Sequence, residues 1–338
     1  MLKEVKPHDI YMAPAELTIF PKPPFNFDLL TALFAKWWPS HFIENFAEGC
    51  YERTLESEVN GSKKIVNKDD NDINLENKIF LIRVSSRGGI EKPKLFIKTF
   101  PVFDKAENIS ESEKKWIAKT VKWIFSTDDD LSGFYELISK YPAYKDMLKN
   151  LKGLKPPKTP TIFEAAIIAI SEQEISLRAA TAIRKRLIEK YGRSFFIDGK
   201  KYYTFPTAAA LSKTKPEDIR ELGFTFKKGQ YMIELANRIL SGGIDLEAMK
   251  NWKTVEIISE LGKIKGFGPW TIKYILQRGF GRFEMVQFED VGLRNGLTAI
   301  LGKKEKISEK EAKDFFEPFG NYKGYFALYL LFNYLLHL

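Results

Sequence analysis

The chain of 338 residues is long enough for two or three domains with hydrophobic cores of their own. Its 53 Lys and Arg residues against 44 Asp and Glu give a net charge of +9, which suits a polyanionic partner without proving one. The single cysteine, Cys50, excludes an internal disulfide framework and a four-cysteine iron–sulfur cluster. The three dispersed histidines make a metal site built from His ligands unexpected.

Neither end of the sequence shows a membrane or export signal. The first fourteen residues, MLKEVKPHDIYMAP, lack the apolar core of a signal peptide. The most apolar run, residues 325–338, is too short to span a bilayer and is typical of a buried helix. We therefore expect an intracellular, cytoplasmic protein that does not associate with a membrane.

Residues 1–105 differ from the rest of the chain in their pattern of helix, strand and turn signals. Residues 28–42 fit a helix, and the runs 79–84 and 94–99 are strand-like, with Gly and Pro turn signals between them. The polar stretch 60–77 is expected to be a surface loop or hairpin tip. This part of the chain is predicted to be a small α+β module that stabilises the protein.

From residue 110 onward the sequence is helical and strand signals nearly vanish. Amphipathic helices are predicted over 112–125 and 131–140, the second capped by the acidic residues 128–130. Residues 151–160 contain three prolines and form an extended connector. We predict an all-α region over residues 106–338.

The next helices are marked by their caps. Thr161 and Glu164 have the spacing of a capping box, and Ser176 is placed to start a second helix. The basic residues 184–193 form either a phosphate-tracking face or a solvated helix end, and the second interpretation is favoured. Three shorter helices are predicted over 207–213, 216–222 and 225–240, with Thr207 and Thr225 as caps of the first and third. Lys227 and Lys228 are candidate phosphate ligands.

The most informative stretch runs from residue 255 to residue 297. Apolar residues follow a helical period before and after the sequence Lys265-Gly266-Phe267-Gly268-Pro269. The glycines permit a tight turn, and a proline suits the first position of a helix. Free N–H groups at such a helix start can bind a phosphate. Twenty residues after Trp270, Asp290 precedes another helical pattern.

Together, the hairpin of Gly266 and Gly268 and the carboxylate Asp290 resemble the helix-hairpin-helix DNA glycosylases, in particular the 3-methyladenine DNA glycosylase II branch. The resemblance covers residues 125–335 well. It implies an α+β protein in which a small antiparallel sheet precedes a helix-hairpin-helix core of two helical subdomains with the active-site cleft between them. It also implies base excision repair of damaged double-stranded DNA by a monomeric hydrolase that flips the target base.

The resemblance assigns catalysis to Asp290. Cleavage of a base–sugar bond develops positive charge on the sugar, which a nearby carboxylate stabilises. A helix start after Asp290 favours its ionised form, although an N-cap role alone would explain the residue without the hairpin. Glu289 is the rival carboxylate, and the family's aspartate matches the second residue of the pair.

Position 270 separates the reaction subtypes. Family members that also cut the DNA backbone carry a lysine nucleophile there, whereas this chain has Trp270. Lys273 lies three residues further and is expected on another helix face. We therefore predict hydrolysis without backbone cleavage.

Three aromatic residues are predicted to form the base pocket. Trp270 and Tyr274 share a helix face, and Tyr322 matches the segment from which the family adds an aromatic residue. Such a cage favours cationic rings, as in N-alkylated purines. Core packing is the alternative for each ring, and Val291 replaces the family's second tyrosine.

The predicted DNA contacts come from the hairpin and from the Gln-x-Ile-Ser turn. Lys265, Gly266, Gly268 and Thr271 would hold phosphates. In the turn, the family's wedge position is Glu174. Either a neighbour such as Gln173 or Ile175 wedges into the duplex, or Glu174 hydrogen-bonds to the orphaned base. No cofactor and no catalytic metal are expected; in relatives the hairpin carbonyls can bind a monovalent cation.

Three functions remain open from the sequence. The favoured one is a monofunctional glycosylase for alkylated or deaminated purines. The alternatives are an 8-oxoguanine-type glycosylase/lyase on the same fold and a non-catalytic DNA-structure-binding protein. A lesion panel and the Asp290→Asn variant distinguish them.

Overall fold

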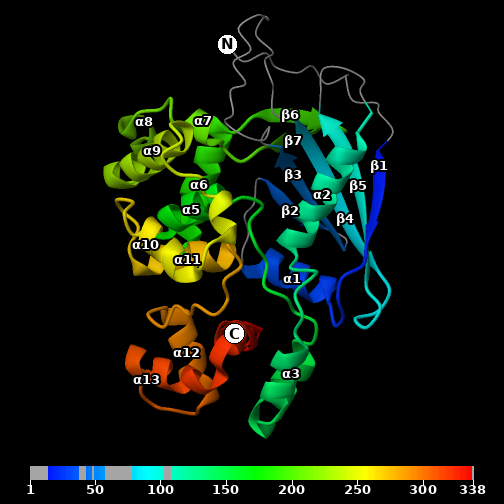
Figure 1. The fold of residues 1–338 in the computed structure, drawn as a ribbon, viewed down its shortest axis with the longest axis vertical. Coiled ribbons are helices and arrows are strands. Elements are labelled where there is room, and N and C mark those ends of the chain that lie inside the picture. The colour runs from blue at the N-terminus through cyan, green and yellow to red at the C-terminus, as the bar shows by residue number, and fades with distance from the viewer. Residues whose placement is uncertain (1–13, 38–42, 48, 58–77, 103–107, 337–338) are drawn as a thin grey trace, which may run out of the picture.

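The computed structural model describes residues 14–37, 43–47, 49–57, 78–102 and 108–336. Its amino-terminal part is a five-stranded sheet, and the rest is mainly helical (Figure 1). The predicted polar loop 60–77, the end of the first predicted helix at 38–42 and all three histidines lie outside the described residues.

The sheet is antiparallel throughout, as the family resemblance implied. Its strands are β1 (Ala15–Ile19), β2 (Glu44–Ala47), β3 (Cys50–Glu56), β4 (Ile79–Arg87) and β5 (Lys94–Val102), in the order β1-β5-β4-β3-β2. Strands β4 and β5 contain both runs predicted from the sequence. Helix α1 (Phe27–Trp37) lies between β1 and β2 in the chain.

The first helices after the sheet begin within one residue of their predicted starts. Helix α2 (Glu111–Ile124) has a complete capping box from Ser110 and Glu113, and α3 (Ser132–Ser139) follows Asp130, whose carboxylate accepts a hydrogen bond from Ser132 N. A short helix α4 (Lys145–Asn150) leads to the proline-rich connector.

The central helices form the second body of the molecule. They are α5 (Ile162–Glu172), α6 (Leu177–Tyr191), α7 (Ala208–Leu211), α8 (Pro216–Arg220), α9 (Phe226–Leu240), α10 (Thr254–Leu261) and α11 (Pro269–Arg278). The predicted caps Thr161, Ser176, Thr207 and Thr225 all accept hydrogen bonds from backbone amides in the first turn. Their short polar side chains pair with amides that have no acceptor within the helix.

One hairpin in this region was not predicted. Strands β6 (Ser194–Ile197) and β7 (Lys200–Tyr203) pair in antiparallel register. Asp198 and Gly199, between them, both have positive φ, at 51° and 75°. An Asp-Gly pair between aromatic residues is a strong hairpin signal, so the expectation that strands vanish after residue 110 was wrong. The hairpin packs against Ile79 and Leu81 of β4.

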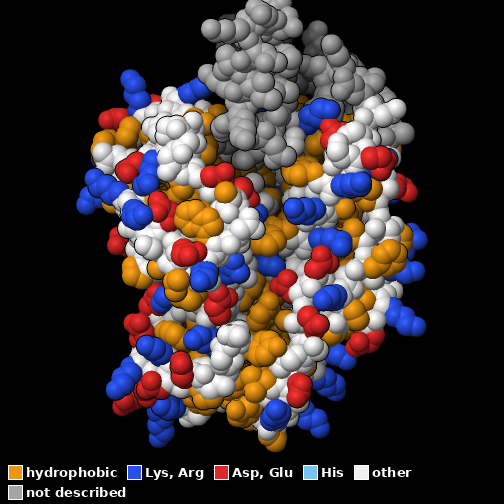
Figure 2. Space-filling model, in the orientation of Figure 1, with side chains coloured by type: hydrophobic (Ala, Val, Ile, Leu, Met, Phe, Trp, Pro, Cys, Tyr) orange, Lys and Arg blue, Asp and Glu red, His pale blue; other side chains and the backbone are white. Residues whose placement is uncertain are grey.

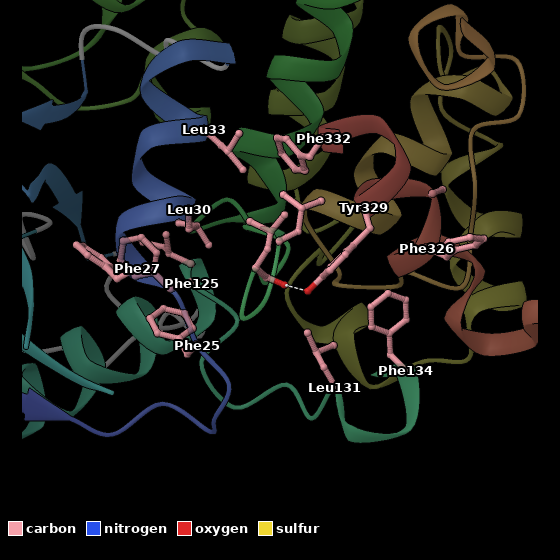
Figure 3. Packing of buried hydrophobic residues seen from close by; sticks show 14 of the residues in the cluster. Phe25, Phe27, Leu30, Leu33, Phe125, Leu131, Phe134, Phe326, Tyr329 and Phe332 are labelled. Carbon is pink, nitrogen blue, oxygen red and sulfur yellow. Dashed lines mark hydrogen bonds between the residues drawn. The ribbon is translucent and has the colours of Figure 1, made fainter. Parts of the chain in front are cut away.

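The last helices return to the amino-terminal sheet. Helices α12 (Val291–Ile300), α13 (Glu309–Phe316) and α14 (Lys323–Leu336) share a hydrophobic core with α1, α2, α3 and the sheet. Figure 3 shows side chains of α1 and α14 in this cluster, where Tyr329 donates a hydrogen bond to Leu154 O at 2.9 Å. A second core joins α5 to α11. The first core thus crosses the predicted boundary at residue 105.

A buried ion network connects the sheet to the second core. Arg53 on β3 is 3% exposed, and its Nη2 donates to both carboxylate oxygens of Glu164 on α5, at 2.7 and 2.5 Å. Arg53 also contacts Glu44. Thr161 Oγ1 accepts from Glu164 N at 3.1 Å, but the Glu164 carboxylate turns to Arg53 instead of back to the cap. The predicted capping box is therefore only half formed.

No helix among the described residues combines the length and hydropathy needed to cross a bilayer. On the face in Figure 2, lysine and arginine side chains are interspersed with acidic ones. The basic side chains visible on that face therefore do not form one continuous positive patch.

Candidate active site

A pocket of about 320 Å³ lies between the two hydrophobic cores. The second core contributes α5 and α11, and the first contributes α12 and α14. Most of its lining is apolar, and its polar side chains are few. This combination is usual for a small-molecule or base-binding pocket. The polar and aromatic lining residues are Glu172, Trp270, Tyr274, Gln277, Arg278, Phe283, Gln287 and Asp290.

Asp290 combines an N-cap with a place in the pocket wall. Its Oδ1 accepts a hydrogen bond from Leu293 N at 2.8 Å, at the start of α12. No ion pair to Asp290 is found among the described residues. The other carboxylate oxygen remains for the pocket. The structure thus confirms the N-cap and places Asp290 in the pocket lining, while its catalytic role stays a prediction.

The rival carboxylate is occupied elsewhere. Both oxygens of Glu289 accept hydrogen bonds from Lys273 Nζ, at 3.0 and 2.8 Å. Neither residue lines the pocket. The ion pair with Glu289 therefore engages the amine of Lys273, the lysine closest in sequence to position 270, where lyases carry their nucleophile.

Two of the three predicted aromatic residues meet in the pocket. The rings of Trp270 and Tyr274 lie with centroids 5.5 Å apart and planes inclined by 34°. Burial, followed by the nearby Glu172, raises the pKa of the Tyr274 hydroxyl well above its ordinary value. That hydroxyl is therefore protonated at neutral pH and can donate a hydrogen bond.

The structure does not bring Tyr322 to this pocket. Its ring belongs to the first core and lies near Phe134 of α3, with centroids 6.3 Å apart. The kink at Gly320, with φ of 50°, precedes it. The pocket wall on this side comes instead from Gly324 and from the apolar face of α14. Tyr322 is therefore a partly buried residue packed against the first core, and the prediction that it lines the base pocket is wrong.

The hairpin between α10 and α11 uses its two glycines differently. Gly266 has φ of 88°, and a Cβ there would overlap the ring of Tyr231 on α9. Gly268 has φ of −76° and is the N-cap of α11, with open space where a Cβ would stand. The fold therefore requires glycine at 266 but not at 268. Lys265 and Gly268 are both exposed at the hairpin tip.

Gln173 fixes this hairpin from the end of α5. Its Nε2 donates to Gly266 O at 2.9 Å and to the hydroxyl of Thr271 at 2.8 Å. Thr271 is 2% exposed, so its hydroxyl serves the hairpin and only its backbone N–H is left for a phosphate. The side chains of Gln173 and Thr271 thus stabilise the hairpin that is predicted to contact DNA.

The turn after Gln173 is held in an unusual conformation. Lys228 Nζ donates to Ser171 O at 3.1 Å and to Gln173 O at 2.6 Å, which closes the end of α5. Burial lowers the pKa of Lys228. Glu174 is exposed and has φ of 55°. The lysine offered as a phosphate ligand is therefore a buried helix cap.

Two apolar residues at the pocket mouth were not singled out as pocket residues. Ile175 and Leu177 line the pocket but are 40% and 39% exposed. Ile175 was predicted only as a possible wedge into the duplex, and Leu177 only as part of the helix that starts after Ser176. Glu172 was also missed; its side chain is 10% exposed at the back of the pocket.

The hairpin carbonyls leave partial room for a cation. Gly266 O accepts from Gln173, and Ile264 O accepts from Phe267 N at 3.1 Å. Each carbonyl keeps a second lone pair, so the monovalent cation that the family resemblance allows stays a prediction. No cluster of three His, Cys, Asp or Glu side chains suited to a metal occurs in the described part of the chain.

These features define a helix-hairpin-helix protein with an aspartate facing a base-sized pocket. Residues 167–320 match the model of the HhH-GPD superfamily of base excision DNA repair proteins. A DNA-3-methyladenine glycosylase of Bacillus subtilis (strain 168) is 28% identical over 222 residues, which cover 66% of this chain and 73% of that one. DNA-3-methyladenine glycosylase 2 of Escherichia coli (strain K12) is 30% identical over 38% of this chain and 44% of its own.

A solved 3-methyladenine DNA glycosylase from Archaeoglobus fulgidus has the same fold. It superposes with a TM-score of 0.74 at 19% identity and covers 94% of this chain and 98% of its own. This match includes the amino-terminal sheet, which the family model does not reach. The chain is thus similar to the HhH-GPD superfamily over residues 167–320, and the relatives named above are DNA-3-methyladenine glycosylases.

Proposed function

We propose that the protein is a monofunctional DNA glycosylase of base excision repair that removes alkylated purines and leaves an abasic site. The observation that carries this proposal is Asp290, a carboxylate without an ion pair among the described residues, in a pocket that also contains Trp270 and Tyr274. Its named relatives are DNA-3-methyladenine glycosylases.

The chemistry follows from the position of the carboxylate. In the proposed reaction the bond between the sugar C1′ and the base nitrogen breaks, and its electron pair leaves with the base. Asp290 stabilises the positive sugar and accepts a proton from the water whose oxygen bonds to C1′. An alkylated purine is cationic and leaves as a neutral base. Cleavage of its bond to the sugar therefore needs less stabilisation from the enzyme.

The proposed partner is double-stranded DNA, bound by one copy of the chain. The target base must leave the duplex, at a cost of a few kcal/mol. The hairpin tip around Lys265 and Gly268, with free N–H groups at the start of α11, would hold the phosphates. A monovalent cation at the hairpin carbonyls is compatible with this contact. An enzyme with this substrate works inside the cell, where the chromosomal DNA lies.

The two alternative functions have less support. A lyase needs an amine in the pocket, yet Trp270 occupies the nucleophile position and Lys273 is paired with Glu289. A purely structural DNA binder has no need for a carboxylate and two aromatic rings in one pocket.

Base release from duplexes methylated at purines tests the proposal. We expect free methylated purine in the supernatant and strand breaks only after alkali, because no amine attacks the sugar. Borohydride should trap no covalent protein–DNA adduct. An adduct, or breaks without alkali, would assign the protein to the lyase class; no released base from any lesion would leave only DNA binding.

The two hairpin glycines give a matched test of the DNA contact. Gly268→Ala should lower stability by less than about 1 kcal/mol, since its Cβ fits, but weaken binding to an abasic-analogue duplex about tenfold by blocking a phosphate. Gly266→Ala should lower the free energy of unfolding by about 2–4 kcal/mol, because of positive φ and overlap with Tyr231. Urea unfolding and fluorescence anisotropy measure the two effects. Equal DNA affinity in Gly268→Ala and wild type would remove the hairpin tip from the interface.

A further inference from the structure

The back of the pocket carries a second carboxylate that the proposed reaction does not use. Glu172 is the last residue of α5, and its side chain is 10% exposed. It lines the pocket that contains Asp290, and also a small internal cavity on the side of the amino-terminal sheet. Glu172 thus stands in the wall between the two spaces, beside Tyr274.

The partner of Glu172 lies behind it. Glu172 Oε1 accepts a hydrogen bond from Arg184 Nη1 at 3.1 Å, and the same nitrogen donates to Ser171 Oγ at 2.8 Å. Arg184 lines the internal cavity but not the pocket. The Arg184 guanidinium therefore holds the Glu172 carboxylate on the side away from the pocket, and one carboxylate oxygen remains available for a group in the pocket.

The pocket wall carries more anionic than cationic side chains, and Arg184 behind the wall pairs with one of the anions, Glu172. Among the residues that line the pocket, the charged ones are Glu172, Arg278 and Asp290, two anions and one cation. The whole chain, by contrast, carries +9. Carboxylates on the pocket wall favour a positively charged base over a neutral one.

Building on the proposed glycosylase activity, we infer that Glu172 is a specificity-determining residue that selects cationic purines, those alkylated at a ring nitrogen, over neutral purines. The carboxylate attracts the positive ring and accepts a hydrogen bond from an amino or ring N–H group at the edge of the base. Trp270 and Tyr274 add aromatic faces that also favour a cation. Burial raises the pKa of Glu172, and Arg184 and Arg278 oppose that shift.

The Glu172→Gln variant tests this role, since glutamine keeps the shape and an acceptor oxygen but removes the charge. Single-turnover release of 3-methyladenine and 7-methylguanine from methylated duplex should fall by about 10- to 100-fold. Binding to a duplex with a tetrahydrofuran abasic analogue, which presents no base, should stay within twofold of wild type. Glu289→Gln, a carboxylate outside the pocket, is the matched control and should retain base release.

The outcomes separate three explanations. Equal losses in base release and in binding to the base-free duplex would mean that Glu172 acts only structurally, and unchanged base release would also overturn the inference. A wild-type protein that releases no methylated base would overturn the proposed function and this inference together. If Glu172→Gln unfolds because Arg184 is left without its partner, the double variant Glu172→Gln/Arg184→Gln removes both charges and should show the same selective loss.

Discussion

Replacing Asp290 by asparagine should reduce the single-turnover rate of base release by about a thousandfold. The loss follows from removing the negative charge that faces the positive sugar in the transition state. Asparagine caps helices about as well as aspartate, so the hydrogen bond to Leu293 N survives and stability changes little. Base release measured by chromatography, together with a melting curve, separates the two effects.

Glu289→Gln is the control for this prediction. It removes the neighbouring carboxylate and its contact with Lys273, but not a group that lines the pocket. Its base release should stay within a few-fold of wild type. If Asp290→Asn retained the parental rate, or if Glu289→Gln caused the larger loss, catalysis would not belong to Asp290.

The second large effect concerns stability. Arg53→Met should lower the free energy of unfolding by about 3–5 kcal/mol, because it leaves the buried Glu164 carboxylate without its partner. The double variant Arg53→Met/Glu164→Gln should recover part of this loss, since the buried Glu164 charge is then removed. Glu44 loses its contact with Arg53 in both variants but keeps the hydrogen bond from Tyr51 at 2.7 Å. Urea unfolding at neutral pH measures both.

An exposed pair on the same sheet provides the comparison. Lys98 and Glu16 lie 3.3 Å apart with side chains 58% and 69% exposed. Lys98→Met should therefore change the free energy of unfolding by less than about 1 kcal/mol. A similar small change for Arg53→Met would show that the buried network does not hold the sheet to α5.

The parts of the site that the sequence predicted depend on local signals. The hairpin, the α11 start at Pro269 and the cap at Asp290 each depend on residues within a few positions of one another. Trp270 and Tyr274 share a helix face because they are four residues apart. These local signals predicted the structure correctly because no tertiary contact displaced the hairpin, the α11 start or the Asp290 cap.

The features that escaped prediction depend on distant partners. Arg53 and Glu164 are 111 positions apart, and the capping-box pattern gave no sign that Glu164 would turn away. Lys228 was offered as a surface cation, but the free carbonyls at the end of α5 draw its amine inside. Tyr322 followed the family pattern, yet packing against α3 decided its place. The missed β6–β7 hairpin is different, since its Asp-Gly turn was present in the sequence.

The shared core of the sheet and helices α12 to α14 has a consequence for synthesis on the ribosome. The strands emerge first, but the helices that cover part of their core follow roughly 190 residues later, about 10–40 s at ordinary elongation rates. During that interval the nascent chain exposes apolar surface that the finished protein buries. The pocket, whose wall includes residues of α14, is complete only after α14 has been synthesised, so a chain that stops before α14 lacks part of the proposed base-binding site.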